Sequence, residues 1–441
     1  MQNKFFRCLS LFLLIGSLQL KAATFTEIDS LGRSVLQSFN NKEFKKLQNM
    51  VDPNYQNYYS DITFERDWNE LIGTYGKYMN SKPVNFEKAP HYSFIAYKIN
   101  FEYLPYILNL SFNDKKELIY VSFMQAHKIY FAPDYADVSK FVEEKFSFQN
   151  EGYELNGLLT MPNSSGKAPL VVILGEAGPT DKDGSYDENR PYKDIAWGIA
   201  SKGYAVYRYD KRSINNGIMM MSLKAGYNSF TCREDYLDDL YKALDTLESL
   251  AGIDKERVYV LGHGQGGMLL PLVAKERKDV KGIIMLGTNA KRIQEMMIDQ
   301  YAYLSTVTPN KKEEYDEQAL KALKSMNKKL NPLTEHKYMP YEVQATYWIW
   351  FNKYKHLDIA KKLKKPILIL HGNRDYQVNM ENLKLWEKTL GENENVSIKS
   401  YPKLNHLFYT GDAESTYSEY YLKSNIPGYV LKDINDWLLT H

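Results

Sequence analysis

The sequence predicts an α/β fold for the C-terminal two-thirds of the chain, preceded by a small α+β domain. Three observations lead to this prediction. From about residue 138 onward, short apolar segments alternate with helical segments, as in a parallel sheet covered on both faces. One of these apolar segments runs through a glycine-rich turn directly into a helix. The chain has 441 residues, more than the roughly 100 to 200 of a typical single domain, so we expect two domains.

Residues 1–22 have the pattern of a secretory signal peptide. Lys4 and Arg7 give a positive start, Leu9 to Leu20 is mostly apolar, and small residues suited to cleavage follow from Ala22. The apolar stretch is shorter than the roughly 20 residues that span a bilayer. We therefore expect a secreted or periplasmic protein with no stable membrane span after cleavage, and an uncleaved N-terminal anchor is the alternative.

Composition argues against several classes of partner. Residues 1–22 carry three basic side chains and no acid, so their removal shifts the formal net charge from +2 to −1. This balance does not favour nucleic acid as a partner. Cys232 is then the remaining cysteine of the sequence, which excludes an internal disulfide.

Residues 24–135 predict the small α+β domain. Apolar residues at helical spacing between residues 24 and 50 predict one or two amphipathic helices. Strands are expected at His91–Asn100, Tyr106–Phe112 and Leu118–Phe123, the last two joined by a polar turn. This order resembles a helix-then-sheet domain of unknown function that precedes secreted bacterial hydrolases and is related to the nuclear-transport-factor-like cone.

Residues 138–441 predict the larger domain. An initial hairpin and six later strands are expected, at Lys145–Phe148, Leu155–Met161, Leu170–Leu174, Tyr204–Tyr209, Val258–Leu261, Gly282–Leu286, Ile367–Leu370 and Val396–Tyr401. Roughly eighty residues separate Leu286 from Ile367, far more than a crossover needs, so we expect an inserted helical lid at about 290–360. Its aromatic run from Tyr347 to Tyr354 is expected to pack mainly within the lid.

The sharpest motif is the strand–turn–helix from Val258 to Lys275. Glycines at Gly262 and Gly266 allow a sharp turn and a close approach of strand and helix, which presents residue 264 at the carboxyl edge of the sheet. At the position where such a turn carries a nucleophile this chain has Gly264, which has no side-chain oxygen to attack an acyl carbon.

An acid and a histidine follow in the order that a catalytic triad requires. Asp375 lies just past the strand Ile367–Leu370, and His406 follows the last strand, thirty-one residues later. In an intact triad, His406 would accept the proton of the nucleophile and Asp375 would fix its tautomer. We therefore interpret both as catalytic residues.

These motifs resemble the α/β-hydrolase superfamily, in particular secreted bacterial esterases and serine-aminopeptidase-like hydrolases, over about Lys145 to His441. The resemblance implies an oxyanion hole formed by the backbone N–H groups of Gln265 and Ala177, and no metal or organic cofactor. The resemblance implies that relatives tend to have a small residue or glycine at position 176, so Glu176 is a departure. Its carboxylate would oppose an oxyanion unless it points away. Asp210 and Arg212 match a motif that more often braces the loop than touches substrate.

The expected function depends on whether the chain has a catalytic nucleophile. The resemblance implies hydrolysis of a small-molecule ester or a short peptide, with serine-type catalysis lost or strongly impaired at Gly264. One alternative is an active hydrolase in which His406 and Asp375 activate a water in the space left by the serine side chain. Another is a non-catalytic envelope protein that binds a ligand. A third is that Gly264 is an introduced change in an otherwise competent enzyme.

Overall fold

The computed structural model describes residues 24–89, 91–102, 104–125, 130–214 and 230–441. The signal peptide predicted at residues 1–22 lies outside these ranges. The chain divides into two compact units, residues 1–128 and 129–441, and the domain ranges expected from the sequence are 24–135 and 138–441. Within the described ranges, no helix combines the length and the apolar character needed to cross a membrane.

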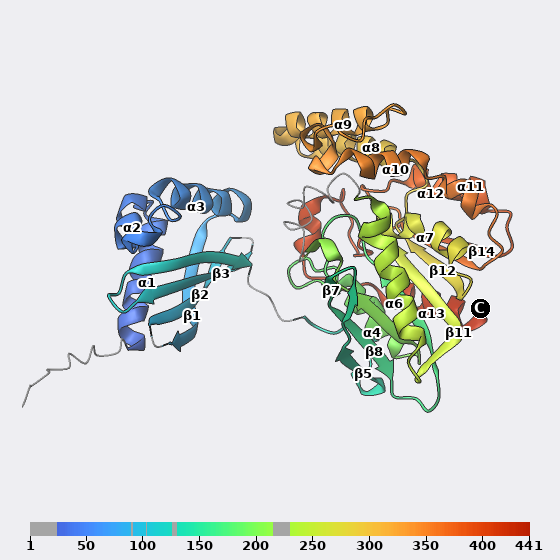
Figure 1. Ribbon diagram of the computed structural model, residues 1–441, viewed down its shortest axis with the longest axis horizontal. Helices are drawn as coiled ribbons and strands as arrows, with labels where there is room; N and C mark the ends of the chain where they lie inside the picture. Colours follow the sequence, from blue (N-terminus) through green and yellow to red (C-terminus); the bar gives the residue numbers. More distant parts are fainter. Residues whose placement is uncertain (1–23, 90, 103, 126–129, 215–229) are drawn as a thin grey trace, which may run out of the picture. The chain divides into compact units, whose positions relative to one another are not determined.

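Among its described residues, the N-terminal unit has a four-stranded antiparallel sheet and three α-helices (Figure 1). These described elements are α1 (Phe25–Asn40), α2 (Phe44–Met50), α3 (Asp61–Tyr75), β1 (Tyr78–Lys88), β2 (Tyr92–Phe101), β3 (Pro105–Asn113) and β4 (Leu118–Gln125). The strands follow the order β1-β2-β3-β4. The predicted helices and three strands are present, whereas α3 and β1 were not predicted.

The helices of this unit bury one face against its sheet. Thr24 caps α1 through a capping box with Glu27, which fixes the start of the helix. Phe39 of α1 is fully buried and stacks on Trp68 of α3 with ring centroids 5.1 Å apart. Tyr97 of β2 donates from its hydroxyl to Asp29 of α1 at 2.8 Å. The unit therefore has a core of its own.

The C-terminal unit has, among its described residues, a central eight-stranded sheet in the order β14-β13-β12-β11-β9-β10-β8-β5. The strands are β5 (Phe141–Lys145), β8 (Gly157–Pro162), β9 (Ala168–Leu174), β10 (Ala205–Tyr209), β11 (Ile253–His263), β12 (Val280–Leu286), β13 (Ile367–Gly372) and β14 (Val396–Tyr401). The six strands from β10 through β14 in the sheet are parallel, and β8 and β5 are antiparallel to their neighbours. This is the α/β architecture that the sequence predicts.

The initial hairpin differs from its prediction. The strand expected at Lys145–Phe148 ends at Lys145, and β5 pairs with β8. Phe148–Asn150 and Tyr153–Leu155 instead form a separate two-stranded hairpin, β6 and β7. Glu151 and Gly152 both have positive φ, 50° and 85°, as a tight two-residue turn requires. This turn signal was missed in the sequence.

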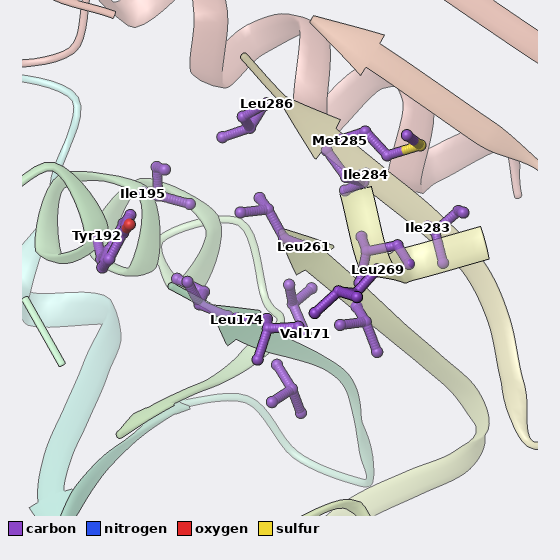
Figure 2. Close-up of a cluster of buried hydrophobic side chains, with 14 of the residues drawn as sticks. Val171, Leu174, Tyr192, Ile195, Leu261, Leu269, Ile283, Ile284, Met285 and Leu286 are labelled. Atoms are coloured by element: carbon purple, nitrogen blue, oxygen red, sulfur yellow. The ribbon is translucent and has the colours of Figure 1, made fainter. Parts of the chain in front are cut away.

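Helices connect and cover the strands. They are α4 (Pro191–Ala200), α6 (Asp238–Glu248), α7 (Gly264–Glu276), α8 (Ile293–Val307), α9 (Lys312–Ser325), α10 (Ala345–Lys353), α11 (His356–Ala360), α12 (Met380–Leu390) and α13 (Gly428–Thr440). Figure 2 shows side chains of β9, β11 and β12 clustered with Tyr192 and Ile195 from α4 and Leu269 from α7. Burial of such apolar surface is the main free energy that holds the sheet and helices together.

The segment between β12 and β13 forms the lid. Figure 1 shows α8, α9 and α10 grouped beyond one end of the sheet, and α9 contacts both α8 and α10. The aromatic run lies in α10 and just after it, where Phe351 is buried among lid side chains. Tyr347 and Trp348, also buried, line a cavity as well, so the run has a second role besides packing.

Candidate active site

The turn from β11 into α7 presents position 264 at the carboxyl edge of the sheet. Gly264 has a φ of 50°, in the left-handed region that disfavours side chains. A Cβ on Gly262 would lie 2.7 Å from backbone atoms of Gly266 and Gly267, so strand and helix approach too closely for any residue but glycine. The turn therefore has the geometry of a nucleophile elbow, with no nucleophile on it.

Asp375 and His406 come together from the ends of two neighbouring strands. Nδ1 of His406 donates to Oδ2 of Asp375 at 2.7 Å, and both residues are buried. The other carboxylate oxygen of Asp375 accepts backbone N–H groups from Gln377 at 2.9 Å and Val378 at 2.8 Å. These bonds orient the carboxylate and leave Nε2 of His406 for the reacting side of the site.

The carboxylate of Glu176 fills the space where a side chain at position 264 would lie. Glu176 follows β9, and a Cβ on Gly264 would overlap its Oε2 and lie 2.6 Å from its Oε1. Nε2 of His406 donates to Oε2 of Glu176 at 2.8 Å. The sequence left the direction of this side chain open, and the structure shows that it points into the site.

The two backbone N–H groups predicted as the oxyanion hole converge on one oxygen. Gln265 donates to Oε1 of Glu176 at 3.0 Å, and Ala177 donates to the same atom. Convergence of two preorganised donors is the arrangement that stabilises a developing oxyanion. The oxygen that they hold here belongs to the protein itself.

The charges of Asp375, His406 and Glu176 stabilise one another. Burial favours the neutral ring of His406, but the charge and hydrogen bond of Asp375, followed by those of Glu176, raise its pKa to about 10. Burial also opposes ionisation of Glu176, yet the hydrogen bond and charge of His406 lower its pKa to about 2. At neutral pH the site therefore holds an imidazolium between two carboxylates.

A second histidine, His263, helps to hold the backbone around His406 and Glu176 in place. Nε2 of His263 donates to the backbone carbonyl of His406 at 2.8 Å, so its Nδ1 accepts the hydroxyl of Tyr192 at 3.1 Å. The same hydroxyl accepts the backbone N–H of Glu176 at 2.9 Å. Burial, followed by the charge of His406, lowers the pKa of His263 to about 4 and keeps it neutral. This network fixes the backbone on both sides of the Glu176–His406 contact.

The same side chains bear on metal binding. Glu176, His263 and His406 bring three potential ligand atoms within 4.8 Å of one another. The lone pair of Nδ1 of His263 is already used by Tyr192, and Nε2 of His406 carries the proton donated to Glu176. A metal ion would have to break both hydrogen bonds, so these residues fit the closed network better than a metal.

The segment after β10 holds the loop that carries Glu176. Asp210 accepts the backbone N–H of Lys182 at 2.8 Å. Nζ of Lys211 donates to the carbonyls of Glu176 at 3.2 Å and Gly178 at 2.9 Å. These contacts fit the bracing role that the sequence suggests for this motif.

A cavity of about 540 Å³ opens from this site toward the lid. Its apolar lining includes Phe230, Ile293, Met296, Met297, Val343 and Trp348. Glu176, Gly264 and His406 form part of its wall. Gln265, another wall residue, donates from its side-chain amide to the hydroxyl of Tyr347 at 2.6 Å, which ties the elbow to the lid. The cavity suits a small, mainly apolar molecule.

The sheet order, the elbow and the Asp375–His406 pair define an α/β-hydrolase. The protein family described as serine aminopeptidase S33 matches residues 183–412, and the chain belongs to this family. A protein family of unknown function, DUF3887, matches residues 33–120 of the N-terminal unit.

Individual proteins that are similar to this chain share 16% to 29% sequence identity with it. Esterase EstD from Thermotoga maritima is 29% identical over 426 residues, which cover 96% of this chain and 98% of that protein. Among solved structures, Est1E from Butyrivibrio proteoclasticus is 20% identical with a TM-score of 0.44, covering 67% of this chain and 98% of that one. The esterase domain of a Rhodothermus marinus protein is 16% identical with a TM-score of 0.41, covering 67% and 97%.

Proposed function

We propose that this family member does not use acyl-serine chemistry and that it binds a small, largely apolar molecule in the cavity beneath the lid. The observation that carries this proposal is the position of the Glu176 carboxylate. One of its oxygens accepts the backbone N–H groups expected to bind an oxyanion, and the other takes the place of a serine side chain beside His406. An ester carbonyl therefore meets an occupied hole and no nucleophile.

Loss of the nucleophile alone would leave some activity. Removal of a triad nucleophile typically leaves a rate about 10³ to 10⁴ above that in water, because the oxyanion hole and substrate binding remain. Here the hole itself is filled by Glu176, so this residual contribution is removed as well. Displacing the carboxylate would break a buried ion pair with His406, which is costly.

The water-activation alternative needs a free base and free space. The imidazolium of His406 donates to Glu176 and cannot accept a proton from water while this bond lasts. The volume left by the missing serine side chain is taken by the same carboxylate. Water activation therefore becomes possible only after Glu176 moves or is replaced.

The contact between Glu176 and Gly264 helps to decide whether Gly264 is natural or introduced. A single introduced Ser→Gly change would leave position 176 as in relatives, with a small residue. In this chain both positions depart from that pattern, and the two residues are in contact. This contact supports a matched natural pair rather than an isolated change.

Ester hydrolysis by a set of four chains tests the proposal. Residues 24–441 are assayed with short-chain aryl esters as the unaltered chain, as Gly264→Ser, as Glu176→Gly and as the double variant. We expect turnover from the double variant alone, because only that chain has a nucleophile and an open hole. Adding His406→Ala to the double variant should abolish it. Comparable turnover by the unaltered chain that depends on His406 would refute the proposal.

We also propose export of the chain, supported by the charged and apolar pattern of residues 1–22. The helix-then-sheet order of the N-terminal unit supports a cone of the nuclear-transport-factor-like type, suited to contacting a partner in the envelope. Fractionation of expressing cells and N-terminal sequencing test export. A chain retained in the cytoplasm with residues 1–22 intact would contradict it.

A further inference from the structure

The Glu176 carboxylate is held as a reacting group would be. Its side chain is 17% exposed and lines the cavity, so a bound molecule can reach it. Oε1 sits between the N–H groups of Ala177 and Gln265, and Oε2 lies 2.8 Å from the imidazolium of His406. The position of each carboxylate oxygen is therefore fixed next to groups that stabilise charge and transfer protons.

The chemistry of a carboxylate selects the kind of carbon that it can attack. Attack on an ester carbonyl would form an anhydride, which is more reactive than the ester and reverts. Attack on a saturated carbon with a leaving group forms an alkyl ester, a stable covalent intermediate. Such an ester on Glu176 would have Oε1 as its carbonyl oxygen, already bound by the N–H groups of Ala177 and Gln265.

We propose that Glu176 is a covalent nucleophile and that this site hydrolyses a small apolar epoxide to a diol through an alkyl ester on Glu176. The inference rests on the proposed absence of acyl-serine chemistry and adds the reaction that the closed site supports. Its reactive groups are Glu176, His406 and Asp375, together with the two backbone donors.

The first step opens the epoxide. Oε2 of Glu176 attacks a ring carbon and forms a new C–O bond, while the bond between that carbon and the ring oxygen breaks. The released alkoxide takes the Nε2 proton of His406, since this proton loses its acceptor when Oε2 becomes an ester oxygen. The products are a hydroxyalkyl ester on Glu176 and a neutral imidazole.

The second step returns the site to its resting state. Neutral His406, oriented by Asp375, accepts a proton from water as the water attacks Cδ of Glu176. The negative charge that develops on Oε1 is stabilised by the two N–H donors. The bond between Cδ and Oε2 then breaks, and the diol leaves with this oxygen and a proton from the attacking water. The overall change is epoxide plus water to diol.

Proton balance favours an epoxide over an alkyl halide. Ring opening consumes the proton that His406 carries and leaves it as the base that the second step needs. Departure of a halide would leave His406 protonated, so the base would have to lose its proton to solvent first. The apolar cavity wall, with Phe230, Met297 and Trp348, suits the body of an aryl or alkyl epoxide.

A single turnover in oxygen-18 water tests this route in the unaltered chain. Residues 24–441, in excess over styrene oxide, react once, and mass spectrometry examines the diol and the tryptic peptide Ala168–Lys182, which contains Glu176. We expect the label in this peptide and unlabelled diol, because the oxygen added to the diol comes from Glu176. Label in the diol with none in the peptide, or no conversion of styrene oxide, overturns the proposal.

Three variants locate the intermediate. Acid quenching of the unaltered chain during the turnover should trap the ester, seen as one styrene oxide added to peptide Ala168–Lys182. His406→Gln should form no ester, because it lacks the proton donor of the first step. Glu176→Gln should lose both the adduct and the label. Glu392→Gln, which alters an exposed carboxylate outside the cavity, should retain both. An adduct from an alkyl bromide but not from styrene oxide refutes the epoxide assignment, whereas the ester assay of the four chains separately tests the loss of acyl-serine chemistry.

Discussion

Oε2 of Glu176 lies 2.8 Å from Nε2 of His406, in the volume that a side chain on residue 264 would occupy. This contact joins two positions, 176 and 264, at which the chain departs from the hydrolase pattern. In this chain the partner of the imidazole is a carboxylate from the loop after β9 and not a hydroxyl on the turn into α7.

Replacing Glu176 by glutamine should lower the pKa of His406. The neutral amide keeps the shape of the side chain but removes one of the two negative charges that raise this pKa to about 10, and Asp375 remains. Histidine titration by NMR measures the value in both chains. An unchanged pKa would show that the Glu176 carboxylate does not contact His406 in solution.

The pH dependence of stability should have a plateau with losses on both sides. His406 has a folded-state pKa raised from 6.5 to about 10, so its contribution is full below 6.5 and is lost as the pH rises toward 10. Glu176 has a pKa lowered from 4.5 to about 2, so its contribution is full above 4.5 and is lost as the pH falls toward 2. Urea unfolding across this range should show a smaller alkaline loss in Glu176→Gln than in the unaltered chain.

Gly264→Ala should destabilise the protein by about 1–3 kcal/mol, since its Cβ meets the Glu176 carboxylate in a left-handed backbone conformation. Glu176→Gly in the same chain should recover part of this loss, because it removes the overlap but not the backbone strain. Urea unfolding of both single variants and the double variant gives the coupling free energy. Additive effects would mean that the two positions do not interact.

Tyr347→Phe should cost about 1–3 kcal/mol of stability by removing the hydroxyl that accepts the Gln265 side-chain amide at 2.6 Å. The amide is buried and would be left without this acceptor. Thermal unfolding measures the loss. Tyr338→Phe, which removes an exposed hydroxyl elsewhere in the lid, provides a comparison that leaves this bond intact. Equal stability of Tyr347→Phe and the unaltered chain would show that the bond does not tie the lid to the elbow.

Arg212→Lys should lower the free energy of unfolding while leaving ester turnover by the Gly264→Ser, Glu176→Gly double variant unchanged. Arg212 donates two hydrogen bonds to Asp239, at 2.7 Å and 2.5 Å, and a lysine cannot reproduce this paired geometry. Urea unfolding and the ester assay measure the two quantities. A drop in kcat/KM without a loss of stability would place Arg212 in substrate binding instead.

Much of the fold follows from local sequence patterns. Buried parallel strands such as β9 are continuous apolar runs, and the glycines around position 264 specify a turn that few other residues can form. The β1 strand was missed because it is an edge strand with little buried surface and so lacks a clear alternation. The α3 helix was missed although its buried residues Phe64, Trp68 and Leu71 recur at helical spacing. The Glu151–Gly152 turn was missed because glutamate is an uncommon residue at positive φ.

The candidate site was predictable in its parts but not in its assembly. Asp375 and His406 follow strand ends, which neighbouring parallel strands bring to the same edge of the sheet. Glu176 was visible as a departure, yet the direction of its side chain depends on empty space at residue 264, eighty-eight positions further along the chain. The sequence offered one signal, because the two unusual residues Glu176 and Gly264 lie in motifs that this fold brings together. Their contact explains both residues.

A crystal structure of residues 24–441 at neutral pH would show where the Glu176 carboxylate lies. We expect density for this carboxylate between Nε2 of His406 and the backbone N–H of Gln265, within hydrogen-bonding distance of both. A Glu176 side chain turned into the cavity, with water bound by Gln265 and facing a free imidazole, would contradict it and favour water activation by His406 and Asp375.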